Sequence, residues 1–165
     1  MSPVIRTVIF TVVVVGFRTL AVPYWLLPRG TRPVRRGSAS GWLLIAAGIA
    51  LYFACAFWGF ALRGRGTPLP LDPPKKLVVE GPYGVVRNPL YWSVALVLLG
   101  EAAVFHSVAL ADCAIVYFVV ASLIVLVFEE PELRRTFGAE YEEYCRRVPR
   151  WLPRLRTNSG PRRAA

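Results

Sequence analysis

The stretch from Gly41 to Leu62 constrains this chain more than any other feature, because its 22 residues include no charged side chain. A helix that crosses a bilayer needs about 20 consecutive apolar residues. Three further stretches, 7–28, 88–106 and 107–128, are comparably long and apolar. Only 18 % of the residues are charged, whereas soluble domains carry about 25 %. The pattern predicts an all-α fold, a polytopic membrane helical bundle with about four transmembrane helices.

The charge balance narrows the possible partners. Lys and Arg outnumber Asp and Glu by 20 to 10, yet 55 % of the residues are hydrophobic. Intrinsic disorder requires low hydrophobicity, so this composition excludes it for the chain as a whole. It also argues against a nucleic-acid-binding domain, whose basic residues would coat a soluble core. We therefore expect the lipid bilayer as a partner and no nucleic acid, and the composition does not indicate an oligomeric state.

The basic residues also predict an orientation. Only His106 and Ser107 separate the last two stretches, so these should form a tight helical hairpin. With four spans, one side of the membrane holds fifteen Lys and Arg and the other holds four. The positive-inside rule then predicts an integral, multi-pass protein with cytosolic N- and C-termini. Within the first stretch, Arg18 interrupts the apolar run and no small-residue cleavage pattern follows, which argues against a signal peptide.

This topology predicts one membrane domain, 1–156, followed by a disordered basic tail, 157–165. Its polar residues lie in two cytosolic pieces, the loop 63–87 and the segment 129–156. Apolar residues recur in the second piece at helical spacing, which predicts an amphipathic helix. These residues are Leu133, Phe137, Tyr141, Tyr144 and Val148. The helix either lies on the membrane, anchored by Trp151, or forms a lid over a cytosolic site.

The sequence does not contain the motifs of several common kinds of binding site. His106 is the only histidine, and the three cysteines are far apart, so we expect no metal site built by the protein. Neither a phosphate-binding P-loop nor a dinucleotide-binding glycine motif is present. Glu101 and Asp112 flank the hairpin turn, where they either reach toward the outer interface or belong to a polar path through the membrane.

A first set of polar residues gathers where the third stretch begins. Pro89 suits the first helical position, with Asn88 or a neighbour as its cap. Tyr83, Arg87 and Tyr91 lie close by in the sequence. A helix start offers free N–H groups to an anion. The alternative is an ordinary interfacial anchor of aromatic and basic side chains.

A second set follows the fourth stretch, as Glu129-Glu130-Pro131-Glu132. Carboxylates at a helix C-terminus are disfavoured by the helix dipole unless a cation relieves them. That cation is either an arginine of the chain or part of a ligand. Because the hairpin brings Asn88 and Glu129 to the same end, the two sets predict a pocket for a zwitterionic ligand with a second positive charge.

Five sequence blocks in a fixed order carry a resemblance to a known family. The blocks are Val79–Tyr83, Arg87–Tyr91, Glu129–Leu133, Phe137–Tyr144 and Arg147–Pro153. They resemble the isoprenylcysteine carboxyl methyltransferase family and, more broadly, the small membrane methyltransferases that include phospholipid N-methyltransferases. The resemblance covers roughly residues 41–153. It implies an enzyme that uses S-adenosyl-L-methionine, bound at the cytosolic end of the last two spans.

The resemblance also implies which residues contact the cofactor. They are Glu80, Gly81, Pro82, Tyr83, Asn88, Ser93 and Glu129. From the charge pattern we add Glu130 as a second candidate for the ammonium group. We also add Tyr91, because its ring or that of Tyr83 would either pack on the adenine or face the sulfonium. Family members have histidine at the position of Asn88, so an acid or base role of that histidine does not carry over. A substrate-binding arginine of the eukaryotic enzymes falls on Val125.

The expected function is methyl transfer to a lipophilic acceptor, such as the carboxylate of an isoprenylcysteine-like lipid. For an acidic acceptor, Arg87 or Arg150 would orient the substrate, whereas Tyr141 would matter more for an amine. These three are the candidate catalytic residues. The alternatives are phospholipid N-methylation, a non-enzymatic carrier or scaffold, and a module that binds anionic lipid through the arginines of the tail.

Overall fold

The computed structural model describes residues 25–26, 39–56 and 76–154. The expected first span, 7–28, falls outside these residues except for Trp25 and Leu26. The end of the second span, residues 57–62, most of the loop 63–87 and the tail 157–165 also lie outside them. The expectations for those segments, and for a single domain, stay predictions.

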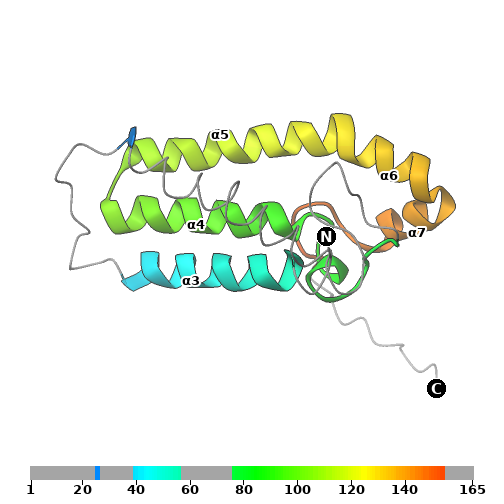
Figure 1. The fold of residues 1–165 in the computed structure, drawn as a ribbon, viewed down its shortest axis with the longest axis horizontal. Coiled ribbons are helices and arrows are strands. Elements are labelled where there is room, and N and C mark those ends of the chain that lie inside the picture. The colour runs from blue at the N-terminus through cyan, green and yellow to red at the C-terminus, as the bar shows by residue number, and fades with distance from the viewer. Residues whose placement is uncertain (1–24, 27–38, 57–75, 155–165) are drawn as a thin grey trace, which may run out of the picture.

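All the regular elements among the described residues are helices, and three of these helices lie side by side (Figure 1). Helix α3, Ala39–Phe53, packs along α4, Pro89–Phe105, and α4 packs along α5, Val108–Ile124. A short 3₁₀ turn, η3 (Gly81–Gly84), precedes α4. Beyond α5 come a π-helical turn, η4 (Val125–Glu129), and the short helices α6 (Glu130–Phe137) and α7 (Ala139–Arg147). The all-helical prediction is confirmed for the described part of the chain.

Within the described part of the chain, two helices are long and apolar enough to cross a membrane. They are Ala39–Ala56 and the continuous helix Val108–Phe137, which comprises α5, η4 and α6. Only 28 % and 22 % of their most apolar windows are buried inside the molecule. The core helix of a soluble protein would be mostly buried instead. Helix α4 is apolar but shorter.

The hairpin between α4 and α5 forms as predicted. His106 ends α4 in the left-handed conformation, with φ 48°, and its N–H binds the Ala102 carbonyl. The Ser107 hydroxyl then caps α5 by accepting the Leu110 N–H at 3.3 Å. Two residues therefore suffice to reverse the chain, and α4 ends and α5 begins within one residue of the predicted positions.

Glycines bring α3 and α4 into close contact. A Cβ atom at Gly48 would lie 2.6 Å from the Ser93 carbonyl oxygen, and one at Gly100 would lie 2.7 Å from the Gly41 carbonyl oxygen. Such distances leave no room for any side chain. Backbone therefore packs against backbone along this interface, which fixes the position of α4.

The segment after α5 differs from the prediction in two respects. The fourth span was expected to end at residue 128, but the helix continues to Phe137 through the π turn η4. Pro131 stands in the first turn of α6, where its missing N–H is tolerated beside a π turn. The expected single amphipathic helix is also wrong. Gly138, with φ 52° and ψ −123°, breaks it into α6 and α7.

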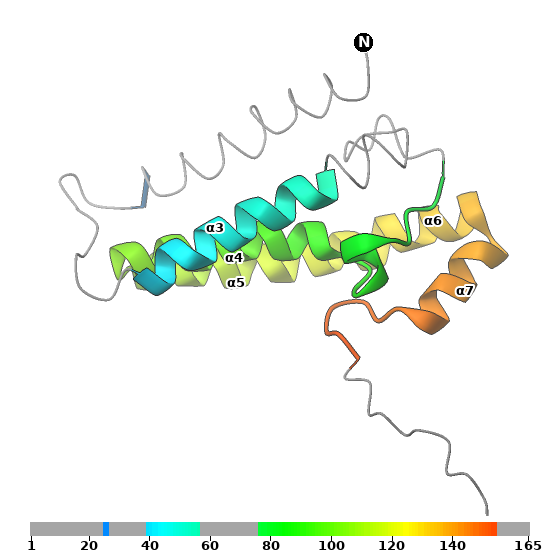
Figure 2. The same ribbon diagram turned by 90° about the horizontal axis from the view of Figure 1, so that it is seen from below.

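The apolar face of this broken segment packs inward. Tyr141, Tyr144 and Val148 form a buried cluster, and Leu77, Leu133, Phe137 and Cys145 pack against it. Figure 2 shows α7 folding back from α6, so that the chain after it returns toward the start of α4. The segment therefore covers the open end of the α4–α5 hairpin, the arrangement expected of a lid.

Candidate active site

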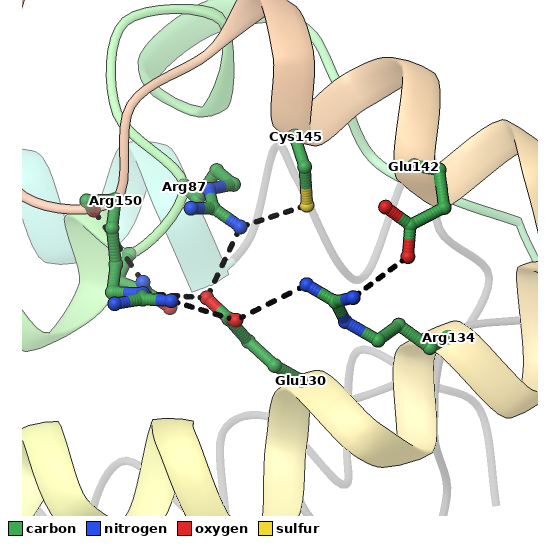
Figure 3. A network of polar contacts seen from close by, with 7 residues as sticks. Arg87, Glu130, Arg134, Glu142, Cys145 and Arg150 are labelled. Carbon is green, nitrogen blue, oxygen red and sulfur yellow. Dashed lines mark hydrogen bonds and ion pairs between the residues drawn. The ribbon is translucent and has the colours of Figure 1, made fainter.

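A buried carboxylate organises the open end of the hairpin. The Glu130 side chain is 6 % exposed and lies at the start of α6. Arg150 binds it with two hydrogen bonds, Nε to Oε1 at 2.7 Å and Nη2 to Oε2 at 2.9 Å. Arg87 Nη1 lies 3.1 Å from Oε1, and Arg134 Nη2 lies 3.9 Å from Oε2. Three arginines from three segments thus converge on one acid (Figure 3).

The same network extends into α7. Arg87 Nη1 also donates to the Cys145 sulfur at 2.7 Å, and Arg134 Nη1 lies 2.9 Å from Glu142 Oε1 (Figure 3). A bidentate arginine–carboxylate pair is among the strongest side-chain interactions and has a fixed geometry. This network therefore holds α7 and the residues after it against the ends of α4 and α5.

Glu129, the neighbouring carboxylate, has a different environment. Its Oε1 accepts a hydrogen bond from the Tyr91 hydroxyl, across the open end of the hairpin. Among the described residues, no arginine, lysine or histidine forms an ion pair with it. The predicted meeting of the α4 start with the α5 end is therefore confirmed. It is made by Tyr91, one turn into α4, rather than by Asn88.

Aromatic rings surround Tyr91. Its ring centroid lies 6.3 Å from that of Trp151 and 6.5 Å from that of Tyr117. Phe118 lies 4.7 Å from Trp151 and 4.9 Å from Trp92. We refer to Tyr91, Trp92, Tyr117, Phe118 and Trp151 as the aromatic cluster. Glu129 accepts its hydrogen bond from the hydroxyl of one member of this cluster. A carboxylate and the face of an aromatic ring each attract a cation, so both kinds of group suit a positively charged ligand.

The cofactor contacts predicted in the loop, Glu80 to Tyr83, differ from one another in exposure. Tyr83 is buried in η3, where its carbonyl oxygen accepts the Tyr144 hydroxyl at 2.7 Å. Glu80 and Gly81 are exposed, and Pro82 is half-buried between them and Tyr83. The hydrogen bond from Tyr144 therefore joins this stretch to α7, and the Tyr83 side chain is buried rather than open to a ligand.

Two other predicted cofactor contacts, Asn88 and Ser93, form hydrogen bonds with backbone carbonyl groups of the protein. Asn88 occupies the cap position of α4 without capping it, and its side-chain amide donates to the Arg150 carbonyl at 3.4 Å. Ser93 is fully buried, and its hydroxyl donates to the Leu90 carbonyl within α4. Contacts of either residue with a cofactor remain predictions.

The candidate catalytic residues are close together. Arg87 and Arg150 share Glu130, and Tyr141 is 2 % exposed beside them. Burial raises the pKa of Tyr141, and the nearby Glu130 charge adds to that effect. Burial likewise raises the pKa values of Tyr83 and Tyr144. These hydroxyls therefore remain protonated near neutral pH, and their catalytic roles remain predictions.

The sequence analysis did not identify several residues of the polar network and the aromatic cluster. Cys145 was considered isolated in the tail, and Tyr117 and Phe118 were treated only as apolar span residues. Trp92 was considered only as part of the alternative of an interfacial anchor. A helical-wheel comparison of the two spans would have placed these aromatic residues on facing turns. The Arg87–Cys145 contact joins residues 58 positions apart, so no local pattern could reveal it. Among the described residues, no three His, Cys, Asp or Glu side chains are placed to hold a metal ion.

Comparison with known proteins gives a family match. The model of a family described as "Phospholipid methyltransferase" matches residues 38–140. Among curated proteins, methanethiol S-methyltransferase 2 of Bradyrhizobium diazoefficiens is 36 % identical over 107 residues, which cover 61 % of this chain and 34 % of that protein. No solved structure matches.

Two further relatives carry names of metal resistance. Nickel-cobalt-cadmium resistance protein NccN of Alcaligenes xylosoxydans xylosoxydans is 35 % identical over 80 residues, 48 % of this chain and 37 % of that protein. Cobalt-zinc-cadmium resistance protein CzcN of Cupriavidus metallidurans is 37 % identical over 79 residues, 48 % of this chain and 36 % of that protein. The matched segments span little more than a third of each of the three relatives.

Proposed function

Because this chain belongs to the phospholipid methyltransferase family, we propose that it is an integral membrane methyltransferase that uses S-adenosyl-L-methionine. A single observation supports the site most directly: Glu129 is oriented by Tyr91, lies beside aromatic rings, and has no ion pair with any described residue. The neighbouring Glu130, by contrast, is already paired with arginines.

The residues present fit this cofactor. S-adenosyl-L-methionine carries an ammonium group, a carboxylate and a sulfonium. Glu129 is suited to the ammonium, and the Tyr91 ring is suited to a cation at its face. When bound, the cofactor supplies a methyl group on a positively charged sulfur. The remaining predicted contacts, from Glu80 to Tyr83 and from Asn88, rest on the resemblance.

The chain's own contribution is alignment and exclusion of water. The ion-pair network around Glu130 holds the segment after α7 over the site, and the aromatic cluster closes its apolar side. Where an anionic nucleophile meets a cationic methyl donor, charge cancels in the transition state, and a low-dielectric site favours that cancellation. Alignment of two reactants can supply up to about 7–11 kcal/mol of the barrier.

The acceptor is proposed to be lipophilic. In the isoprenylcysteine-like case, a carboxylate would be oriented by Arg87 or Arg150 after release from Glu130. A phospholipid amine would need no such arginine, and Tyr141 could then contact it. The relative named a methanethiol S-methyltransferase adds a thiol as a third class. Methyl transfer to matched carboxylate, amine and thiol lipids distinguishes these three.

Orientation is part of the proposal. The end that carries Glu129 and the lid also carries most of the basic residues, so we place it in the cytosol. The acceptor would then arrive through the bilayer and the cofactor from the cytosol.

Cofactor-dependent thermal stability in detergent tests this function. We expect S-adenosylmethionine and S-adenosylhomocysteine to raise the unfolding temperature and ATP to leave it unchanged. A ligand at 100 times its dissociation constant stabilises a protein by about 2.7 kcal/mol. Glu129→Gln should weaken the shift. Glu132→Gln is the matched control, because Glu132 is exposed and paired with Arg135. The absence of any shift in a folded sample, repeated in nanodiscs, would overturn the proposal.

A non-enzymatic carrier is the second candidate, because one carboxylate oxygen of Glu101 is buried and has no hydrogen-bond partner among the described residues. Buried carboxylates inside membrane helices mark polar paths in many transporters. A carrier would lose function in Glu101→Gln and keep it in Glu129→Gln. The methyltransferase proposal predicts the opposite pattern for cofactor binding.

A further inference from the structure

The chain after α7 turns back toward the start of α4 in a bent, non-helical segment, Pro149–Pro153 (Figures 1 and 2). Three consecutive carbonyl oxygens of this segment accept hydrogen bonds from residues at or near the start of α4. The pairs are Arg87 N–H to Pro149 at 2.9 Å, the Asn88 amide to Arg150 at 3.4 Å, and the Trp92 indole N–H to Trp151 at 2.9 Å.

Hydrogen bonds to these carbonyl oxygens are most important away from water, because an unpaired backbone carbonyl is costly there. Two of the five residues are prolines, which have no N–H to satisfy. The Arg150 guanidinium is neutralised by two hydrogen bonds to Glu130. Non-helical backbone is tolerated at membrane depth only when its polar groups find partners within the protein. The segment meets much of that requirement.

The depth of the segment follows from helix geometry. The exposed apolar face of α5 and η4 runs from Val108, 75 % exposed, to Phe128, 68 % exposed. Twenty residues of helix span about 30 Å, which equals the thickness of the hydrocarbon core. Phe118 lies halfway along this stretch of helix, where it is half-buried. Because the Trp151 ring lies 4.7 Å from the Phe118 ring, Trp151 reaches well below the level of Phe128.

The side chain that follows is apolar and open. Leu152 is 71 % exposed, on a segment whose backbone is fixed to α4. The arginines before it, Arg146 and Arg147, are exposed at the end of α7, which is the polar side of such a boundary. The acyl chains of the bilayer would cover an exposed leucine that lies next to a tryptophan packed on α5.

We propose that Pro149–Pro153 re-enters the bilayer beside α4 and α5, with Leu152 and Trp151 in contact with lipid acyl chains. The segment is then a membrane contact as well as the end of a lid. Trp151 lies 6.3 Å from the Tyr91 ring, so lipid would come within one side chain of the residue that orients Glu129. The inference depends on the membrane helices and not on methyl transfer.

Spin labels in nanodiscs test this placement. Single cysteines at positions 152, 128 and 140 are labelled in a chain whose three native cysteines are replaced, and collision with oxygen is compared with collision with a water-soluble nickel chelate. We expect position 152 to resemble position 128, with oxygen dominant, and to differ from the exposed position 140. If position 152 instead resembles position 140, the segment lies in water and the proposal fails. If position 128 does so too, the helix itself lies outside lipid, and the proposal fails for that separate reason.

A second measurement leaves the native cysteines in place. Wild type and Trp151→Phe are reconstituted into vesicles with or without phospholipids brominated at mid-chain. The fluorescence that Trp151→Phe removes should be strongly quenched by the brominated lipid. Trp42→Phe, on the exposed surface of α3, is the matched control for loss of one tryptophan. An unquenched Trp151 contribution in folded protein would contradict insertion.

Discussion

Helix α4 uses its two neighbours in different ways. Toward α3 it packs closely, because Gly100 of α4 and Gly48 of α3 leave no room for a side chain at those two positions. Toward the open end of α5 it presents Tyr91 and Trp92, whose partners are a carboxylate and aromatic rings. One interface is closed to any ligand, and the other holds groups that a ligand could use. The contrast suggests that the α3 contact fixes α4 so that Tyr91 keeps its position relative to Glu129.

The largest expected effect comes from breaking the closed interface. In Gly48→Leu, the new side chain would begin 2.6 Å from the Ser93 carbonyl oxygen, and backbone cannot move aside as a side chain does. Overpacked cores lose about 1–3 kcal/mol, occasionally more, and we expect the upper end or beyond. The measurements are folded yield in detergent and unfolding temperature.

Ala47→Leu is the matched control for that substitution, because Ala47 is exposed on the same helix. It should leave both quantities close to wild type. If Gly48→Leu folded as well as Ala47→Leu, the close contact between α3 and α4 would be wrong, and with it the idea of a rigid support for α4.

A smaller effect is expected at the charged side of the open interface. Glu130→Gln removes the partner of Arg87 and Arg150 while keeping the shape of the side chain. Breaking a fully buried pair costs about 3–5 kcal/mol. Arg150 is 33 % exposed, so water compensates part of the loss and we expect on the order of 2 kcal/mol. The unfolding temperature should fall, and proteolysis after α7 should become faster.

The exposed Glu132, changed to Gln, controls for the loss of one charge. A Glu130→Gln protein as stable and as protease-resistant as Glu132→Gln would show that the arginine network does not hold the lid. The open interface would then depend on the aromatic cluster alone.

The hairpin was predictable because its signals are local. An apolar run fixes each span, Pro89 marks a helix start, and His106 with Ser107 leaves room only for a tight turn. The break at Gly138 was missed for an equally local reason. Apolar residues keep helical spacing across it, from Leu133 through Tyr141, so the periodicity indicated one helix where the backbone turns at a glycine with positive φ.

The site was predictable only in outline. The hairpin argument brought the start of α4 to the end of α5, and the structure confirms that approach through Tyr91 and Glu129. It could not separate the two carboxylates, because the partner that distinguishes Glu130 is Arg150, on a segment that returns only after the turn at Gly138. Contacts such as that of Tyr144 with the Tyr83 carbonyl, 61 residues away, depend on tertiary folding and leave no sequence pattern.

The smallest effect should come from the hydrogen bond that joins the two helices at the site. Tyr91→Phe keeps the ring among its aromatic neighbours and removes only the hydroxyl that orients Glu129. A hydrogen bond within a protein contributes about 0.5–1.5 kcal/mol to stability, and more where one partner is charged. We therefore expect a fall of a few degrees in the unfolding temperature and, because Glu129 loses its orientation, about tenfold weaker binding of S-adenosylhomocysteine by calorimetry. Tyr117→Phe, whose ring also neighbours Tyr91, is the control. Equal affinities in the two variants would mean that the ring of Tyr91 matters at the site and its hydroxyl does not. A loss confined to Tyr91→Phe would mean that the hydroxyl serves binding, because it holds the Glu129 carboxylate in one orientation.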